Sequence, residues 1–245
     1  MLDTRCWILD ENRGSRIENR CIFEVYRVQP LIIVGIFAVI VVAGILAYIG
    51  ARKRREAMGA LAARLGLSFN PNKNWDLARR YHFLDKLRRG SNRYAFNILS
   101  GNYQGHNVVL FDYHYQIRSD RSTHHYYFSF FVLHLQMSFP ELIIDKEGFF
   151  SKVAQAVGYD DIDFESHEFS RNFLVRSHDK KFAYDVCNGR MIEYLLANSD
   201  LSIEIEGDAL TISFNHRLAP EQIEPNLERL IAVRSLMPDY LFSRS

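Results

Sequence analysis

Asp112, His114 and His125 are the residues whose types and spacing come nearest to a metal site. They fall in two stretches rich in aromatic and β-branched residues, 107–117 and 124–137, which predict two strands of a hairpin. Side chains alternate along a strand, so all three can share one face of that hairpin. Two imidazoles and one carboxylate on a common face are a ligand set suited to a divalent transition metal.

The metal site depends on the register of the hairpin. A turn about Ser119–Asp120 places His114 directly opposite His125, within reach of a shared ion. A slip of one residue would turn one strand's side chains to the other face. The alternative interpretation is that the three residues are ordinary cross-strand partners that face solvent or a neighbouring strand. A metal-dependent or hydrolytic enzyme is therefore the alternative function.

Other catalytic signatures are weak. Cys187 lies among apolar residues of a predicted helix, where a small buried hydrophobe is expected. The chain contains neither a G-x-S-x-G nor an H-E-x-x-H pattern. The acidic stretch 160–165 lacks the glycine and the glutamate of a calcium loop. No glycine-rich phosphate loop follows a strand. We therefore expect no catalytic residue and no cofactor.

The run Leu31–Ile49 has nineteen residues without a charge or a strongly polar side chain. As a helix it is about 28 Å long, close to the hydrocarbon thickness of a bilayer. A buried core helix rarely stays apolar on every side for this length, and a cleaved signal peptide has its basic residues before the apolar run. Residues 30–50 are therefore predicted to form one transmembrane helix.

Positive charges follow this segment more densely than they precede it. Four adjacent cations, Arg52, Lys53, Arg54 and Arg55, stand after it, which predicts an inner-membrane protein with a cytoplasmic C-terminal domain. Residues 51–100 carry a net charge of +9 and residues 101–245 a net charge of −8. The position of the basic region beside the apolar run favours anionic lipid headgroups as its partner, and not nucleic acid.

Residues 1–29 show no sustained period and are predicted to be a loosely ordered tail. If this tail lies outside the cell, Cys6 and Cys21 could form a disulfide. Residues 51–69 continue as a basic juxtamembrane helix.

Residues 70–240 predict an antiparallel α+β domain, with two lobes at 70–148 and 169–240 on either side of an acidic linker, 159–168. The expected strands are 94–99, 107–117, 124–137, 141–145, 173–177, 201–206 and 209–214, and the expected helices are 75–87, 149–157, 179–196 and 223–237.

A motif in the second half of the domain has the form F-x3-F-x-V-x-S-x-D-x3-A and consists of Phe169, Phe173, Val175, Ser177, Asp179 and Ala183. With it, the chain resembles bacterial single-pass membrane proteins of unknown function, and the resemblance covers about residues 52–240. Many relatives have Leu-Thr-Pro where this chain has 186–188. The motif has structural roles: apolar anchors on a strand, hydroxyl and carboxylate acceptors at a helix start, and a small residue for close packing.

The leading hypothesis is a membrane-anchored domain that binds a partner protein or the membrane surface, with Arg52–Arg55 as the lipid contact. Whether Asp112, His114 and His125 line one pocket separates this hypothesis from the enzyme alternative.

Overall fold

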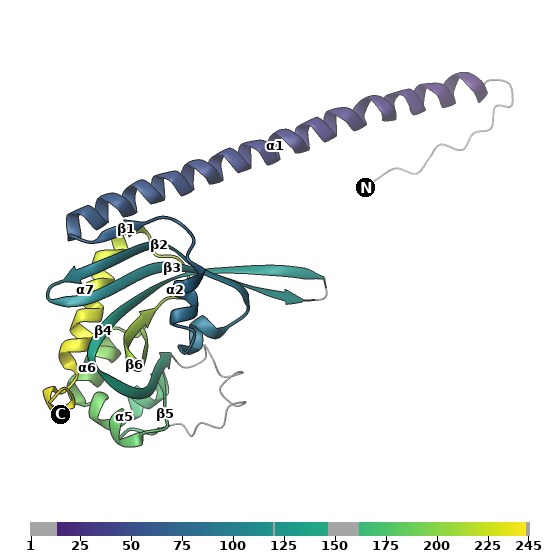
Figure 1. Ribbon diagram of the computed structural model, residues 1–245. Helices are drawn as coiled ribbons and strands as arrows, with labels where there is room; N and C mark the ends of the chain where they lie inside the picture. Colours follow the sequence, from purple (N-terminus) through teal and green to yellow (C-terminus); the bar gives the residue numbers. More distant parts are fainter. Residues whose placement is uncertain (1–13, 120, 147–161, 244–245) are drawn as a thin grey trace. The chain divides into compact units, whose positions relative to one another are not determined.

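Figure 1 shows the computed structural model, which describes residues 14–119, 121–146 and 162–243, with side chains from Ile32 onward. The chain divides into two compact units between Lys53 and Arg54. The first unit holds most of helix α1 (Gly14–Leu65), and the second holds an antiparallel sheet with its helices. The predicted α+β architecture is confirmed.

Helix α1 includes the predicted membrane segment. Of the described helices, it alone is long and apolar enough to cross a membrane, and every side chain from Ile32 to Ile49 is exposed. In the described structure this run therefore contributes no side chain to the core. The helix begins at Gly14, within the stretch that we expected to be a loose tail. The pair Cys6–Cys21 lies outside the described side chains.

The described part of the second unit contains six strands. They are β1 (Ser68–Asn70), β2 (Ser91–Tyr103), β3 (His106–Ser119), β4 (Ser122–Lys146), β5 (Phe173–Ser177) and β6 (Ser202–Ser213). The described helices after α1 are α2 (Trp75–Arg80), η1 (Asp85–Arg88), α4 (His167–Asn172), α5 (Lys180–Val186), α6 (Gly189–Ala197), α7 (Pro220–Leu236) and η2 (Asp239–Leu241).

Strand β4 organises the sheet. The strand order is β1-β2-β3-β4-β5, and β6 also pairs with β4. The predicted hairpin between 201–206 and 209–214 is wrong, because both stretches belong to β6 and pair with β4 across a register shift at Gly207. Strands from both predicted lobes thus belong to one sheet.

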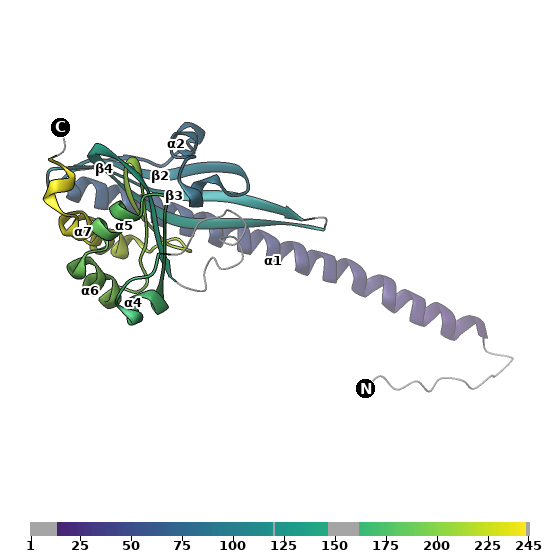
Figure 2. The same ribbon diagram turned by 90° about the horizontal axis from the view of Figure 1, so that it is seen from below.

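Apolar side chains fill both faces of this sheet. Helices α5, α6 and α7, together with Met58 and Leu61 near the end of α1, cover one face in the larger cluster. The segment 77–87, with α2 and η1, covers the other face through Tyr81, Leu84 and Leu87. Figure 2 shows α2 and the helices α5–α7 on opposite sides of the strands. The result is a sheet between two unequal layers of helix.

Two predicted helices are each divided. The stretch 75–87 forms α2 and the short 3₁₀ helix η1. The stretch 179–196 forms α5 and α6, because the first helix ends at its C-cap Cys187 and Asn188 caps the second by accepting from the Met191 amide at 3.2 Å. The predicted helix 149–157 lies outside the described residues.

The motif residues lie in α4, β5 and α5. Phe169, Phe173 and Val175 are buried in the larger cluster. The Asp179 carboxylate accepts from the Phe182 amide at 2.9 Å. The hydroxyl of Ser177 donates to Glu141 O at 2.5 Å and accepts from the Asp179 amide at 3.1 Å, so the motif joins β4, β5 and α5.

Cys187 is the buried C-cap residue of α5. Burial raises the pKa of its thiol to about 12, so at neutral pH the group is an uncharged thiol and not a nucleophile.

The backbone conformation and the surroundings of Gly90 leave no room for a side chain. Its φ is +64°, and a Cβ would lie 2.5 Å from the Gln116 carbonyl oxygen. We expect Gly90→Ala to lower the free energy of unfolding by about 2 kcal/mol, since left-handed backbone strain and displacement of β3 act together. Gly207 has φ +59° and nothing within 4 Å of its Cβ position. Gly207→Ala should therefore lower the free energy of unfolding by only about 1 kcal/mol. Urea unfolding in detergent measures both, and equal losses would contradict the steric part.

Candidate functional site

The register of the central hairpin differs from the predicted one. Strand β3 pairs Asp112 with Ser129, His114 with Tyr127 and Gln116 with His125. The β4 partner of each β3 residue is therefore two positions further along the chain than predicted, because the turn lies between Ser119 and Ser122. A displacement of two keeps the predicted face. His114 and His125 are then diagonal neighbours, with Nε2 and Nδ1 2.9 Å apart.

The Asp112 carboxylate, 1% exposed, already has four protein donors. Arg54 donates from Nε at 3.1 Å and from Nη2 at 2.9 Å, a two-bond geometry that strengthens an ion pair. Asn97 donates from Nδ2 at 2.9 Å and Ser129 from its hydroxyl at 3.0 Å. Within the described residues, this aspartate is thus the centre of a hydrogen-bonded network.

The two histidines lie in an aromatic setting. The His114 ring stacks on Tyr94 with centroids 4.5 Å apart and also contacts Tyr127 at 4.7 Å. Its Nδ1 is 3.0 Å from Asn92 O. Burial lowers the pKa of His114, so the imidazole is neutral at pH 7.

Another group of potential metal ligands is Glu141, Glu204 and Glu206, whose nearest oxygens lie within 4.8 Å of one another. The Asp85 amide donates to Glu204 Oε1 at 2.6 Å. Burial raises the pKa of Glu204 to about 8, which indicates a protonated carboxyl at pH 7. A proton there makes this cluster a poor cation site.

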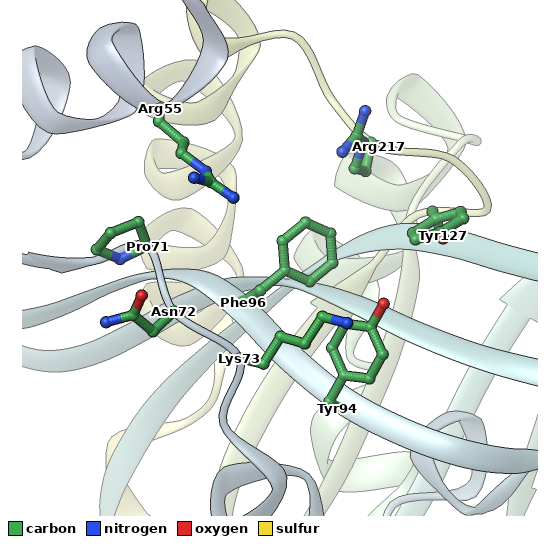
Figure 3. Close-up of a pocket in the computed structure, with 8 residues that line it drawn as sticks. All are labelled: Arg55, Pro71, Asn72, Lys73, Tyr94, Phe96, Tyr127 and Arg217. Carbon is green, nitrogen blue, oxygen red and sulfur yellow. The ribbon is translucent and has the colours of Figure 1, made fainter. Parts of the chain in front are cut away.

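A pocket of about 550 Å³ opens on the same face of the sheet as His114. Its lining comes from five separate parts of the second unit, and Figure 3 shows the side chains around the cavity: Arg55, Pro71, Asn72, Lys73, Tyr94, Phe96, Tyr127 and Arg217. Two aromatic residues stand on β2 and one on β4, whereas the cations stand on α1 and on two connections. We call it the basic–aromatic pocket.

Cations and rings are combined within this pocket. The Lys73 ammonium lies 4.4 Å from the Tyr94 ring centre, and the Arg217 guanidinium lies 5.8 Å from that of Tyr127 and 6.0 Å from that of Phe96. Such distances allow cation–π attraction. Burial raises the pKa of the Tyr94 and Tyr127 phenols, so both remain neutral hydrogen-bond donors at neutral pH.

The positive charge of the pocket is not balanced locally. No carboxylate is among its eight lining residues. Within the described part of the chain, none of Arg55, Lys73 and Arg217 forms an ion pair. Like charges around one cavity repel one another, and a bound anion would remove that repulsion.

The Asp112 network holds three neighbours of the pocket in place. Arg54 precedes Arg55, and its Nη1 donates to Leu218 O at 2.6 Å. The Leu218 amide in turn donates to the Ser129 hydroxyl at 3.0 Å, which fixes the residue after Arg217. Asn97, with φ +49°, follows Phe96. The network therefore positions one aromatic and two cationic lining residues.

The predicted lipid-contact residues divide into two kinds. Arg52, Lys53 and Arg55 are exposed, whereas the Arg54 side chain is 12% exposed and is turned to Asp112. Arg55 is the only one of the four that lines the pocket.

Sequence reasoning missed Lys73 and Arg217 as site residues. The signal available for them was weak: a cation beside the Asn70–Asn72 turn, and a cation just before the last helix.

No family model matches the chain, and no curated protein matches it. Among solved structures, it is similar to the crystal structure of the mycobacterial trehalose monomycolate transport factor A, TtfA. The TM-score is 0.54 at 14% sequence identity, over 77% of this chain and 97% of that chain. At this identity the likeness shows a shared fold. It leaves the motif resemblance to bacterial single-pass membrane proteins a prediction.

Proposed function

We propose that this protein is a membrane-anchored binding module with no catalytic role, whose C-terminal domain recognises an anionic group in the basic–aromatic pocket. The observation that carries the proposal is the convergence of Arg55, Lys73 and Arg217 on one cavity without a carboxylate in its lining. Arginine forks suit phosphate and carboxylate groups, and the rings of the pocket suit an apolar or planar part of the same ligand.

The fold likeness is consistent with such a role. The similar structure is that of the mycobacterial trehalose monomycolate transport factor A. A factor that handles an amphipathic molecule needs a polar site with apolar walls, and the basic–aromatic pocket combines both. The enzyme alternative has less support, because the Asp112 carboxylate that it needs as a metal ligand already accepts hydrogen bonds from Arg54, Asn97 and Ser129.

We further propose that residues 30–50 cross the inner membrane once and that the pocket faces the cytoplasm. The four cations at 52–55 resist translocation. A C-terminal alkaline phosphatase fusion, which is active only outside the cytoplasm, should be inactive, and a C-terminal fluorescent protein should be bright. An active phosphatase fusion would reverse the orientation.

Anion recognition is tested with the full chain in nanodiscs of phosphatidylcholine. Phenyl phosphate, which carries a dianion on a ring, should bind, and phenol should not. Replacing Arg217 with glutamine should weaken the binding about tenfold, since a charge-assisted hydrogen bond is worth about 1.5–3 kcal/mol. Saturation-transfer NMR on the ligand measures the affinity.

The matched control is Arg190→Gln, an exposed cation on α6 outside the pocket lining. This variant should bind phenyl phosphate as the unmodified chain does. Equal binding by the Arg217 variant, or equal affinity for phenol, would show that the pocket does not recognise the anion.

A further inference from the structure

We propose that the anion is the phosphate headgroup of an anionic glycerophospholipid drawn from the bilayer that holds α1. This inference rests on the proposed function and names its ligand class. A free phosphate ester shares the same chemistry, so the proposal has to distinguish the lipid from a soluble source.

The short length of chain between the apolar run and the pocket supports a membrane lipid as the ligand. Arg55 lines the pocket and follows Ile49, the last residue of the apolar run, by six positions. Along a helix six residues span about 9 Å. The headgroup layer extends about 5–8 Å beyond the hydrocarbon core on each side. Because this separation is short, the first cation of the pocket is tethered close to the headgroup phosphates.

Aromatic side chains at the pocket point to the same environment. Tyr127, in the lining, is 42% exposed, and Trp75 is 50% exposed, with its ring 6.1 Å from that of Tyr94. Tryptophan and tyrosine prefer the membrane–water interface, where their apolar rings and polar groups are both accommodated. The exposed rings beside the pocket therefore fit a ligand that lies at the membrane surface.

The dimensions and charge of the pocket suit one headgroup. A volume of about 550 Å³ is in the range of small-molecule sites. Two guanidinium groups and one ammonium, from Arg55, Arg217 and Lys73, exceed the single charge of a phosphodiester. Such an excess favours anionic over zwitterionic lipids, since the latter bring a cation of their own into the pocket.

The test uses acetylation of Lys73 in the full chain. Nanodiscs of phosphatidylcholine are compared with nanodiscs in which phosphatidylglycerol replaces part of that lipid, and the labelling rate of each lysine is read by mass spectrometry. We expect Lys73 labelling to fall about fivefold with phosphatidylglycerol, as for a site about four-fifths occupied. Lys180, exposed and outside the lining, should label at an unchanged rate and serves as the internal control.

Two further arms separate the sources. In the Arg217→Gln variant, phosphatidylglycerol should no longer protect Lys73 from acetylation. Protection that persists in this variant would mean a general attraction of the domain to the anionic membrane surface, and it would overturn the proposal. Soluble glycerol 3-phosphate, added to phosphatidylcholine nanodiscs at millimolar concentration, should protect weakly. If it protects as well as phosphatidylglycerol does, the lipid assignment fails while anion recognition stands. If phenyl phosphate binds but phosphatidylglycerol gives no protection, the lipid assignment alone fails; if neither acts, both proposals fail.

Discussion

Replacing Asp112 with asparagine should lower the free energy of unfolding by about 4 kcal/mol, because loss of one partner of a buried ion pair leaves the other charge uncompensated. Asp112 is 1% exposed and the Arg54 side chain 12% exposed, so water cannot replace the lost partner. The new amide group would also face the Ser129 hydroxyl, which donates to the carboxylate at 3.0 Å. Urea unfolding of the full chain in detergent, followed by tryptophan fluorescence, measures the change.

A surface ion pair supplies the control for this experiment. Asp76 and Arg79 form a pair three residues apart, with side chains 85% and 75% exposed. Asp76→Asn should therefore change the stability by less than about 0.5 kcal/mol. The double variant Arg54→Gln/Asp112→Asn removes both buried charges and should be less destabilised than the sum of its single variants. A loss below about 1 kcal/mol for Asp112→Asn would mean that the pair contributes little.

The secondary structure of the domain was largely predictable because local patterns determine it. The strand predicted at 173–177 coincides with β5, and Asp179 caps the following helix as expected. The hairpin prediction at 201–214 failed for a non-local reason. Gly207–Asp208 has turn chemistry, but a neighbouring strand with free edge positions, β4, pairs with the residues on both sides of it.

The candidate site was less predictable than the fold. The alternation of β3 and β4 correctly placed Asp112, His114 and His125 on one face, yet the partner of Asp112 is Arg54, 58 residues away. A pattern within the hairpin cannot supply that partner. Lys73 and Arg217 are likewise separated by 144 positions and line one pocket only because the connections before α2 and α7 both reach it in the folded domain.

Arg54 also changes how the basic region is understood. From the sequence, residues 52–55 form one topology signal. In the structure, Arg54 stabilises the domain through Asp112 and Leu218, and Arg55 faces the pocket. Under the proposed function, one short charged run therefore serves folding through Arg54 and, as proposed, orientation and recognition as well. Substituting all four cations together would confuse these roles, whereas single substitutions separate them.

Glu204 should make the stability of the protein depend on pH between about 4.5 and 8. Burial raises the pKa of its carboxyl to about 8, so the folded protein keeps a proton that the unfolded chain releases near pH 4.5. The folded state binds more protons in this interval, and the free energy of unfolding therefore falls as the pH rises. The contribution is fully present below pH 4.5 and is lost by the time the pH exceeds 8.

Glu204→Gln isolates this contribution. Glutamine is neutral at every pH and keeps the oxygen that accepts from the Asp85 amide. Near pH 5 the variant should match the unmodified chain within about 1 kcal/mol, and by pH 9 it should be more stable by a few kcal/mol, since each pKa unit corresponds to about 1.4 kcal/mol. Asp85, Lys86 and Asp145 also face Glu204, so the difference between the two proteins reports the titration of Glu204 together with its coupling to these groups. Glu193→Gln, on an exposed position of α6, is the control and should show a constant difference. Unfolding midpoints in urea from pH 5 to 9 measure the effect, and a Glu204→Gln difference that stays constant over this range would show that Glu204 is ionised in the folded protein throughout.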